Sequence, residues 1–454
     1  MTYAVAGAVR QGKHWHSPIE SANSETSTHW QRVPTPGPRA SRKHLAAATW
    51  RILAAPGGTR VPRVGCKDWA VDLETFQWLL TEEGQILLAA AATAHGSELQ
   101  VQGQLRRTAA PERVAAAMGQ VELRRKAVEK MGDDASRMYF TREGLEQATR
   151  ARVATHRAAR LAAAGPSVVD LTCGIGGDLV AFARAGLTTA GVDLDPLRVE
   201  IARANLAALG LGGALRTADG TTLDVSPFAS AYADPARRSG RGRTFRVDDW
   251  APPWSFVETL LRGASCVKVA PGIPRSLVPE GVEAEWVSDA GDVKEAALWS
   301  PRLSTTTRRA TVIGRGGLAT LTDEDDHDAD VGEVAEFLYE PDGAVIRAGL
   351  VTAVAAGVGG HLVNRRIAYV TSAHEYRTPF ARAYRVVEPL PYREKQLKAA
   401  LRERRIGTLT IKKRGVDISP EGLRQRLALR GEEAATIVLT RAGGEGIALL
   451  VEPR

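Results

Sequence analysis

The stretch "VVDLTCGIGGD", Val168 to Asp178, decides the fold that we expect for this chain. A short apolar run ends in an acidic residue and leads into a turn with three glycines, Gly174, Gly176 and Gly177. Glycine lets the backbone turn tightly and approach a ligand closely. The pattern "DLVAFARAG" that follows has helical spacing. A strand that passes through a glycine turn into a helix is typical of a parallel α/β sheet.

The alternation of short apolar runs and helical patterns continues for about a hundred residues. The apolar runs are "SVVDL", "LTTAGVDLD", "ALRTAD", "SAYAD" and "SCVKVAP", with "PLRVEIARANLAALG" and "WSFVETLLRG" as helical patterns among them. This alternation predicts a mostly parallel sheet with helices on both faces. Three later runs, "EAEWVSD", "KEAALWS" and "RRATVIG", are expected to form antiparallel edge strands.

Composition divides the chain into six segments. Residues 1–60 are rich in Ser, Thr, Pro, His and Arg, which predicts a disordered basic tail. Residues 61–150 have helical patterns, and "FTREGLEQATRARVATHRAARLAAAG" predicts one long helix with Thr141 as its N-cap. The α/β segment is expected over 151–320. It is followed by an acidic linker at 321–330, a mixed connecting segment at 331–380 and a basic module of helices and β runs at 381–454.

The composition is that of a soluble globular protein, with 454 residues, 44% hydrophobic and 25% charged. No apolar run approaches the ~20 residues of a membrane span, and the start of the chain lacks the pattern of a signal peptide. The cysteines Cys66, Cys173 and Cys266 are far apart and lack metal-ligand spacing. These features predict a cytoplasmic protein without a membrane anchor, a disulfide framework or a metal.

Positive charge is concentrated at the two ends of the chain. The net charge is +8, with 8 basic and 2 acidic residues over 1–60 and 17 basic and 10 acidic residues over 375–454. A basic C-terminal module on a more acidic body favours a polyanionic partner. Solubility is the alternative explanation for the same charge.

Acidic residues stand where the predicted parallel strands end, and ligands of such sheets bind beyond those ends. Asp170 ends the first strand and Asp193 the second, 23 residues later, which is the usual place for an acid that binds ribose hydroxyls. Asp219 ends the third strand, and Asp234 ends the fourth.

A nicotinamide dinucleotide fits this pattern poorly. The fingerprint for that cofactor requires glycine where Leu179 stands, and no basic residue follows the first turn to hold a pyrophosphate. A nucleoside without phosphates fits better, with the glycines on its tail, Asp193 on the ribose and Asp219 on the adenine amino group. We therefore expect S-adenosylmethionine as the cofactor, held by residues of the first three strand ends: Asp170, Thr172, Gly174, Gly176, Gly177, Asp193 and Asp219.

The fourth strand end, "YADPARRSGRGR", is the candidate catalytic turn. Asp234, on a turn fixed by Pro235, is placed to accept a hydrogen bond from a substrate amine or hydroxyl. Arg237 and Arg238 are candidates to hold substrate phosphates, and the alternative is that they pair with "DD" at 248–249. Lys268, on the fifth strand, is expected to line the same pocket or to be a strand residue with a solvated tip.

Over roughly residues 69–454 the chain resembles a family of bacterial methyltransferases. The resemblance rests on "DLTCGIGGD", "YADPARRSGR", "CVKVAPGIP", "GDVKEAALW" and the terminal "IGTLTIKKRGVD" and "LRQRLALRG". It implies a Rossmann-like class I S-adenosylmethionine-dependent methyltransferase domain between an N-terminal helical domain and a small C-terminal α+β THUMP-like domain. Members are regarded as RNA methyltransferases. Thr172 departs from the class, in which many members have a glycine at this position.

Basic residues of the C-terminal module are the candidate RNA contacts. The set consists of Arg402, Arg405, Lys412, Lys413 and Arg414, with Arg238 added from the catalytic turn. Tyr384 and Tyr392 are candidates to stack on bases. Such phosphate contacts position an RNA without reading its sequence, and a solvated basic face is the alternative.

We therefore expect an S-adenosylmethionine-dependent methyltransferase that acts on a base of a structured RNA, either tRNA or rRNA. Asp234, Pro235, Arg237 and Lys268 are its candidate catalytic residues. Two alternatives stay open at this point. One is a methyltransferase for a small molecule or a protein, and the other is a non-catalytic RNA-binding protein that keeps the fold.

Overall fold

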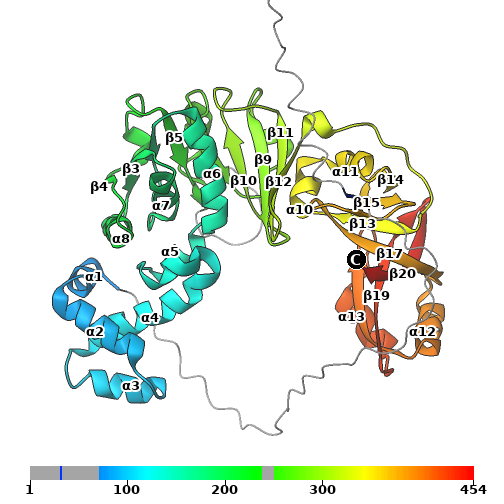
Figure 1. The fold of residues 1–454 in the computed structure, drawn as a ribbon, viewed down its shortest axis with the longest axis horizontal. Helices are drawn as coiled ribbons and strands as arrows, with labels where there is room; N and C mark the ends of the chain where they lie inside the picture. The colour runs from blue at the N-terminus through cyan, green and yellow to red at the C-terminus, as the bar shows by residue number, and fades with distance from the viewer. Residues whose placement is uncertain (1–30, 33–70, 238–249) are drawn as a thin grey trace, which may run out of the picture. The chain divides into compact units, whose positions relative to one another are not determined.

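The computed structural model describes residues 31–32, 71–237 and 250–454 of the chain (Figure 1). These residues belong to two compact units. The nine-stranded unit holds the described residues 71–237, 250–326 and 342–350, and the seven-stranded unit holds 31–32, 327–341 and 351–454. Apart from residues 31–32, the tail predicted at 1–60 lies outside the described residues.

Helices open the nine-stranded unit, which confirms the predicted N-terminal helical region. They are α1 (Leu73–Leu79), α2 (Glu82–Thr93), α3 (Glu98–Leu105), α4 (Pro111–Met131), α5 (Arg142–Gln147) and α6 (Ala151–Ala164). Local signals start several of them: Thr81 caps α2, Ser97 forms a capping box with Gln100 at α3, and Pro111 is the first residue of α4. Buried apolar side chains of α1 to α5 belong to one core cluster, whereas those of α6 pack in clusters with strands of the sheet.

The single long helix expected from Thr141 onward is wrong, because the chain leaves the helical conformation between α5 and α6. Lys130 of α4 donates hydrogen bonds to the carbonyl oxygens of Leu145, Glu146 and Ala148, and so satisfies the end of α5. Thr149, in the break, is buried, and its hydroxyl donates to Asp178 at 3.0 Å. Tertiary contacts therefore override a continuous helical pattern. Thr141 does cap α5, as expected, through the backbone N–H of Gly144.

The large sheet has the order β12-β11-β9-β10-β8-β5-β2-β3-β4. Its strands are β2 (Ser167–Asp170), β3 (Thr188–Asp193), β4 (Ala214–Thr217), β5 (Ser230–Ala233), β8 (Ser265–Val269), β9 (Glu283–Asp289), β10 (Asp292–Trp299), β11 (Arg308–Gly314) and β12 (Gly317–Thr322). Neighbours from β4 to β8 are parallel, which confirms the Rossmann-like core. Helices α7 (Gly177–Arg184), α8 (Pro196–Ala208), α9 (Trp254–Leu260) and α10 (Gly343–Ala348) complete the unit.

The prediction of three antiparallel edge strands is confirmed for the antiparallel pairing of β9 with β10 and is wrong for β11, and none of the three strands lies at the edge of the sheet. Strand β10 runs antiparallel to both β8 and β9, whereas β11 runs parallel to β9. The reason is topological. The chain leaves β10 at the end where β9 begins, and β11 starts from that end on the other side of β9. The unpredicted strand β12 then pairs antiparallel with β11 and forms the edge.

The seven-stranded unit is a mixed sheet with the order β14-β15-β13-β17-β20-β19-β18. Its strands are β13 (Phe337–Pro341), β14 (His361–Asn364), β15 (Ile367–Ser372), β17 (Ala381–Leu390), β18 (Ile406–Lys413), β19 (Glu433–Ala442) and β20 (Glu445–Pro453), with helices α11 (Val351–Gly357), α12 (Glu394–Glu403) and α13 (Pro420–Leu427). A short strand, β16 (Tyr376–Arg377), pairs with β1 (Gln31–Arg32). Among the described neighbouring strands of the seven-stranded sheet, β18 and β19 run parallel and the other pairs run antiparallel. The segment expected to connect the domains, 331–380, thus adds strands to the same sheet as the C-terminal module.

Within the part of the chain that the structure describes, no helix combines the length and the apolar character that a membrane span requires.

Candidate functional site

The glycine turn after β2 has the conformation that its sequence predicts. Gly174 and Gly176 have positive φ angles of 51° and 82°, which side chains with a Cβ atom rarely adopt. The buried amide of Asn205 in α8 holds the turn, since it donates to the carbonyl oxygen of Ile175 at 2.8 Å. The same amide exchanges hydrogen bonds with the backbone of Tyr139, between α4 and α5. The N-terminal helices therefore brace the turn.

Asp193 lies directly beside the glycine turn. One of its carboxylate oxygens accepts the N–H of Gly174 at 3.0 Å, and the other accepts the N–H of Asp195 at 3.0 Å. Each oxygen has a second lone pair, so two further donors can bind. The half-buried carboxylate at the end of β3 is thus suited to paired hydroxyls such as those of a ribose.

Asp219 lies at the start of a short turn after β4 and is exposed. Its Oδ1 atom accepts hydrogen bonds from the backbone N–H and the hydroxyl of Thr221. These bonds lower the pKa of Asp219 below its ordinary value. Among the described residues, the other oxygen of this carboxylate has no hydrogen-bond partner, so it remains available to a donor such as an exocyclic amine.

Asp170 and Thr172 link the glycine turn to the catalytic turn. Asp170 is buried and accepts the N–H of Thr172 at 3.0 Å, and burial raises the pKa of Asp170 well above its ordinary value, with nearby Asp178 adding to the effect. The hydroxyl of Thr172 accepts the N–H of Asp234 at 2.7 Å. Thr172 therefore ties the first strand end to the fourth.

Asp234 and Lys268 form an ion pair at the ends of neighbouring parallel strands. The Nζ atom of Lys268 lies 2.5 Å from Oδ2 of Asp234 and 3.1 Å from the hydroxyl of Thr149. The side chain of Lys268 is 16% exposed and that of Asp234 is 32% exposed. Burial alone would lower the pKa of Lys268, but Asp234, Glu295 and Asp178 outweigh burial and raise it. The ammonium is fixed rather than solvated, and the alternative of a solvated tip is wrong.

The candidate catalytic turn continues into residues that the structure describes only in part. The backbone of β6 (Ala236–Arg237) pairs antiparallel with β7 (Trp250–Ala251). The side chain of Arg237 lies outside the described residues, as do Arg238 and the acidic pair at 248–249. Their predicted contacts with substrate phosphates therefore stay predictions.

A buried chain of charged and polar groups extends from the Asp234–Lys268 pair, and three of its members, Thr149, Asp178 and Arg157, were not among the candidate residues predicted from the sequence. Arg157 in α6 is almost fully buried, contacts both Asp178 and Glu295, and lies over the ring of Tyr232 at 4.6 Å. The complete chain runs through Asp234, Lys268, Thr149, Asp178, Arg157 and Glu295. In the sequence, Arg157 stands four residues after Val153 and four before Leu161. This helical spacing, which puts it on the apolar face of α6, is the one signal that marks it.

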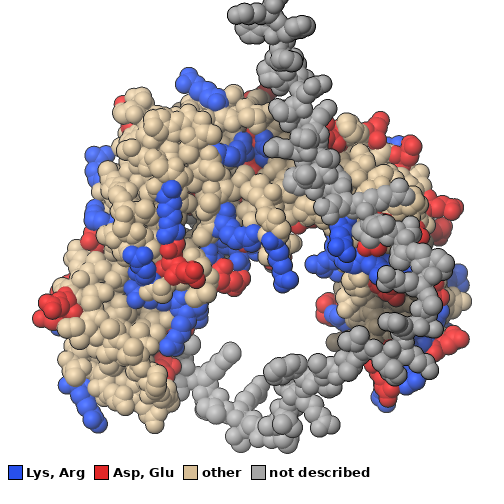
Figure 2. All heavy atoms as spheres, in the orientation of Figure 1, with Lys and Arg blue, Asp and Glu red and all other residues tan. Residues whose placement is uncertain are grey.

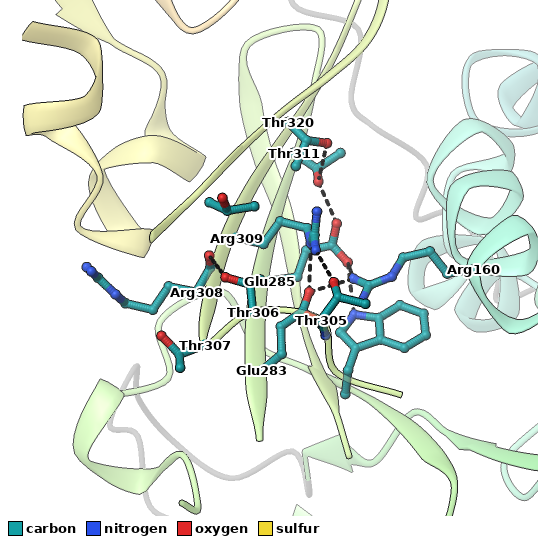
Figure 3. Close-up of polar contacts among 12 residues, drawn as sticks. Arg160, Glu283, Glu285, Thr305, Thr306, Thr307, Arg308, Arg309, Thr311 and Thr320 are labelled. Carbon is teal, nitrogen blue, oxygen red and sulfur yellow. Dashed lines mark hydrogen bonds and ion pairs between the residues drawn. The ribbon is translucent and has the colours of Figure 1, made fainter. Parts of the chain in front are cut away.

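A second buried cluster, shown in Figure 3, fastens α6 to the antiparallel side of the sheet. Glu283 and Glu285 of β9 are both fully buried. Arg160 contacts both of them at 2.8 and 2.7 Å, and Arg309 contacts Glu283 at 2.7 Å. Burial raises the pKa of Glu285, but His156 and Arg160 outweigh it and hold that pKa well below the ordinary value. Every charge here has a partner, so we interpret the cluster as structural.

Neither described cysteine has the surroundings of a nucleophile. Cys173 and Cys266 are free and buried, and burial raises the pKa of both thiols. Cys266 lies near the start of β8, away from the strand end where the site lies. Among the described residues, no group of His, Cys, Asp and Glu has a metal-binding arrangement.

The seven-stranded unit separates the predicted RNA contacts into two groups. Lys412 and Arg414 both turn toward Glu340, at 3.1 and 3.6 Å, and are half-buried. Lys413 is exposed, as are Arg402 and Arg405. On the face drawn in Figure 2, Lys and Arg side chains lie close to Asp and Glu side chains in many places. The partner of each basic residue, rather than the count of charges, therefore decides which ones can bind a ligand.

The two candidate stacking tyrosines are less available than expected. The ring of Tyr384 is buried and its hydroxyl donates to Glu340 at 3.1 Å, so the prediction that it stacks on bases is wrong. Tyr392 is half-buried, and its ring packs against Gly446, where a Cβ atom would lie 2.4 Å from the ring.

The chain is similar to known proteins in both sequence and fold. A family model described as THUMP domain-like matches residues 381–453, and a domain of unknown function matches 72–127. Curated relatives from two strains of Mycobacterium tuberculosis are 39% identical over 333 residues, which are 71% of this chain and 91% of the relative. Each relative is described as an uncharacterized S-adenosylmethionine-dependent methyltransferase. The crystal structure of a proposed methyltransferase from Porphyromonas gingivalis W83 has the same fold, with a TM-score of 0.65, 23% identity, and coverage of 84% of this chain and 98% of that one.

Proposed function

Because the chain belongs to the family of S-adenosylmethionine-dependent methyltransferases that includes the mycobacterial relatives, we propose that it methylates a base of a structured RNA, either tRNA or rRNA. The observation that supports the reaction site is the Asp234–Lys268 pair, which lies one hydrogen bond from the glycine turn through Thr172. The observation that supports RNA is the THUMP-like unit with its exposed basic residues.

The residues of the first three strand ends fit the cofactor. S-adenosylmethionine supplies an electrophilic methyl group on a sulfonium. Asp193 would bind the ribose hydroxyls, Asp219 the adenine amino group, and the glycine turn the methionine tail. This assignment uses the second lone pairs of the Asp193 carboxylate and the unpartnered oxygen of Asp219.

Asp234 would orient the attacking group of the substrate. Its carboxylate can accept a hydrogen bond from an amine or a hydroxyl and direct the lone pair of that group toward the methyl carbon. Lys268 keeps the carboxylate in place and balances its charge. Alignment of this kind lowers a barrier by about 7–11 kcal/mol when it is complete, so small displacements of Asp234 should slow the transfer.

The test of this function is the loss of one modified nucleoside. Mass spectrometry of nucleosides from total tRNA and rRNA should show one methylated nucleoside missing in a deletion strain. The purified protein should restore it with labelled S-adenosylmethionine and RNA from that strain. Incorporation of label into protein or small molecules, with none into RNA, would overturn the proposal.

The cofactor assignment predicts that Asp193→Ala weakens the binding of S-adenosylhomocysteine. The hydroxyls of the ribose would lose a partner in a half-buried site, at about 1–3 kcal/mol. Isothermal titration calorimetry measures this loss directly, without any RNA. Unchanged affinity would show that Asp193 only holds the backbone of Gly174 and Asp195.

A matched pair of variants separates ligand contact from turn geometry at Asp219. Asp224 begins a similar turn, in which its carboxylate accepts the N–H of Ser226 at 2.9 Å, as that of Asp219 accepts the N–H of Thr221 at 2.9 Å. We expect Asp219→Ala to weaken the same ligand and Asp224→Ala to leave it unchanged. Equal effects of the two variants would remove Asp219 from the cofactor site.

Thr149 is predicted to be a positioning residue for Lys268. Thr149→Val keeps the shape of the side chain but removes the hydroxyl that accepts from Lys268 and donates to Asp178. We expect the single-turnover rate to fall about tenfold, since ~1.4 kcal/mol is a typical cost of one lost buried partner. Affinity for S-adenosylhomocysteine should be unchanged. Thr149→Ser should restore the rate, and failure of this rescue would argue against the hydroxyl.

A further inference from the structure

The seven-stranded unit has a hollow of about 440 Å³ whose lining includes three arginines. Its lining residues are Arg402, Arg405, Ile406, Ala428, Arg430, Gly431 and Glu432. Three guanidinium groups thus line one concave surface with a single carboxylate. Arg430 was not among the RNA contacts predicted from the sequence.

Parallel strand pairing brings these residues together. Strands β18 and β19 run parallel, so the loops that enter them meet at one edge of the sheet. Arg405 precedes β18, and Arg430 precedes β19. The two loops touch, because a Cβ atom on Gly431 would lie 1.6 Å from the carbonyl oxygen of Arg405. Only glycine permits this approach, and Gly431 itself lines the hollow.

The backbone of the hollow is held in an uncommon conformation. Arg405 and Ala428 have positive φ angles of 55° and 43°. Such a conformation costs free energy for a residue with a side chain and persists only where the surrounding structure holds it. The surrounding fold therefore holds the backbone from which the Arg405 side chain extends.

The charges in the hollow are open to a ligand, unlike those of neighbouring arginines. Arg404 binds Glu388 through two nitrogens, at 2.8 and 2.7 Å. Among the described residues, Arg402 and Arg430 have no acidic partner. Arg405 pairs with Glu432 at 2.7 Å, but both side chains are largely exposed, and such a pair contributes little and exchanges readily.

We propose that this hollow binds backbone phosphates of the RNA substrate, with Arg402, Arg405 and Arg430 as donors. The inference rests on the proposed RNA methyltransferase function and identifies the contact that holds the RNA. Guanidinium forks match phosphate oxygens in geometry and charge. The lining has no aromatic residue on which a base could stack, so phosphate rather than base is the group it fits. Lys412 and Arg414, by contrast, are occupied by Glu340.

The experiment compares two double charge reversals in the full-length protein. Arg402→Glu with Arg430→Glu changes the hollow, and Arg424→Glu with Arg426→Glu makes the same charge change on α13, where each arginine already has an acidic partner. Binding of bulk bacterial tRNA and rRNA is measured by filter binding at several salt concentrations. For the hollow variant we expect weaker binding and a log–log salt slope reduced by about 0.7–0.9 for each lost phosphate contact.

The control variant should have a clearly smaller effect, and both variants should bind S-adenosylhomocysteine like the unsubstituted protein. An unchanged slope for the hollow variant, or an equal loss in the control, would overturn the phosphate site while the RNA function stands. Absence of salt-dependent RNA binding by the unsubstituted protein would overturn both. A hollow variant that also loses the cofactor would indicate general misfolding and count against a local phosphate site.

Discussion

Asp234→Asn is expected to lower the single-turnover rate of methyl transfer by about 100-fold or more, with nearly unchanged affinity for cofactor and RNA. The substitution keeps the size of the side chain and removes its charge. The amide oxygen of asparagine can still accept from Lys268, but an NH2 donor replaces the second carboxylate oxygen, so the substrate group would lose its acceptor and its orientation. Contributions of positioned acid–base groups are typically 10²–10⁴-fold, and a fall in rate without a fall in affinity is the signature of a contact made in the transition state.

The measurement is incorporation of labelled methyl groups into RNA from a deletion strain, with enzyme in excess. Asp292→Asn is a suitable control, because Asp292 also pairs with a lysine, Lys294 at 3.2 Å, in the same sheet but with an exposed carboxylate. This control should transfer methyl groups at the normal rate. An Asp234→Asn variant with the normal rate would show that the carboxylate is structural.

The conformation of the glycine turn and the positions of the acidic strand ends could be predicted because their signals are local. The glycine turn, the acidic strand ends and the proline after Asp234 each act over a few residues. For Asp234 and Lys268 the sequence predicted that both line one pocket, but not that they form an ion pair. The ion pair follows from the sheet order, since Ala233 lies opposite Val267 in neighbouring parallel strands and the next residue of each strand ends up side by side.

The buried chain behind that pair could not be derived from local patterns. Thr149 reaches Asp178 and Lys268 only because α5 ends early, and the end of α5 depends on Lys130 of another helix. Arg157 lies in an alanine-rich helix whose packing position is set by the tertiary fold. Helical spacing could place it on the inner side of α6, but not opposite Asp178 and Glu295.

The acidic partners of the run Lys412-Lys413-Arg414 could not be derived from local patterns either. Alternation along β18 puts Lys412 and Arg414 on one side and Lys413 on the other. Lys412 and Arg414 form ion pairs with Glu340 of β13, which lies some seventy residues earlier in the chain. A basic run in the sequence therefore does not show which of its members lack an acidic partner. The hollow at the loops before β18 and β19 could not be predicted either, because its residues are separated in the sequence.

Arg157→Met is expected to destabilise the protein by about 3–5 kcal/mol, the usual cost of removing one partner of a buried ion pair. Methionine fills much of the space of the arginine stem, so a cavity is not the main cause. Asp178 and Glu295 would be left with uncompensated charge in the interior. Denaturant unfolding measures the loss. Arg203→Met, which removes the partially exposed partner of Glu200, should change the free energy of unfolding by less than about 1 kcal/mol.

The pH dependence of the loss gives a second, independent check. In the native protein burial raises the pKa of Glu295, and Arg157 opposes that rise. Without Arg157 the pKa of Glu295 in the folded state rises further. The added cost is therefore complete above the folded pKa of the variant and disappears as the pH falls through the lower folded pKa of the native protein. The deficit of Arg157→Met should therefore shrink from neutral pH toward pH 4. Adding Glu295→Gln to Arg157→Met should recover part of the loss at neutral pH, because it removes one of the two unpaired charges. A deficit that is independent of pH and unrelieved by the second substitution would mean that Arg157 stabilises the fold through packing against Tyr232 rather than through its charge.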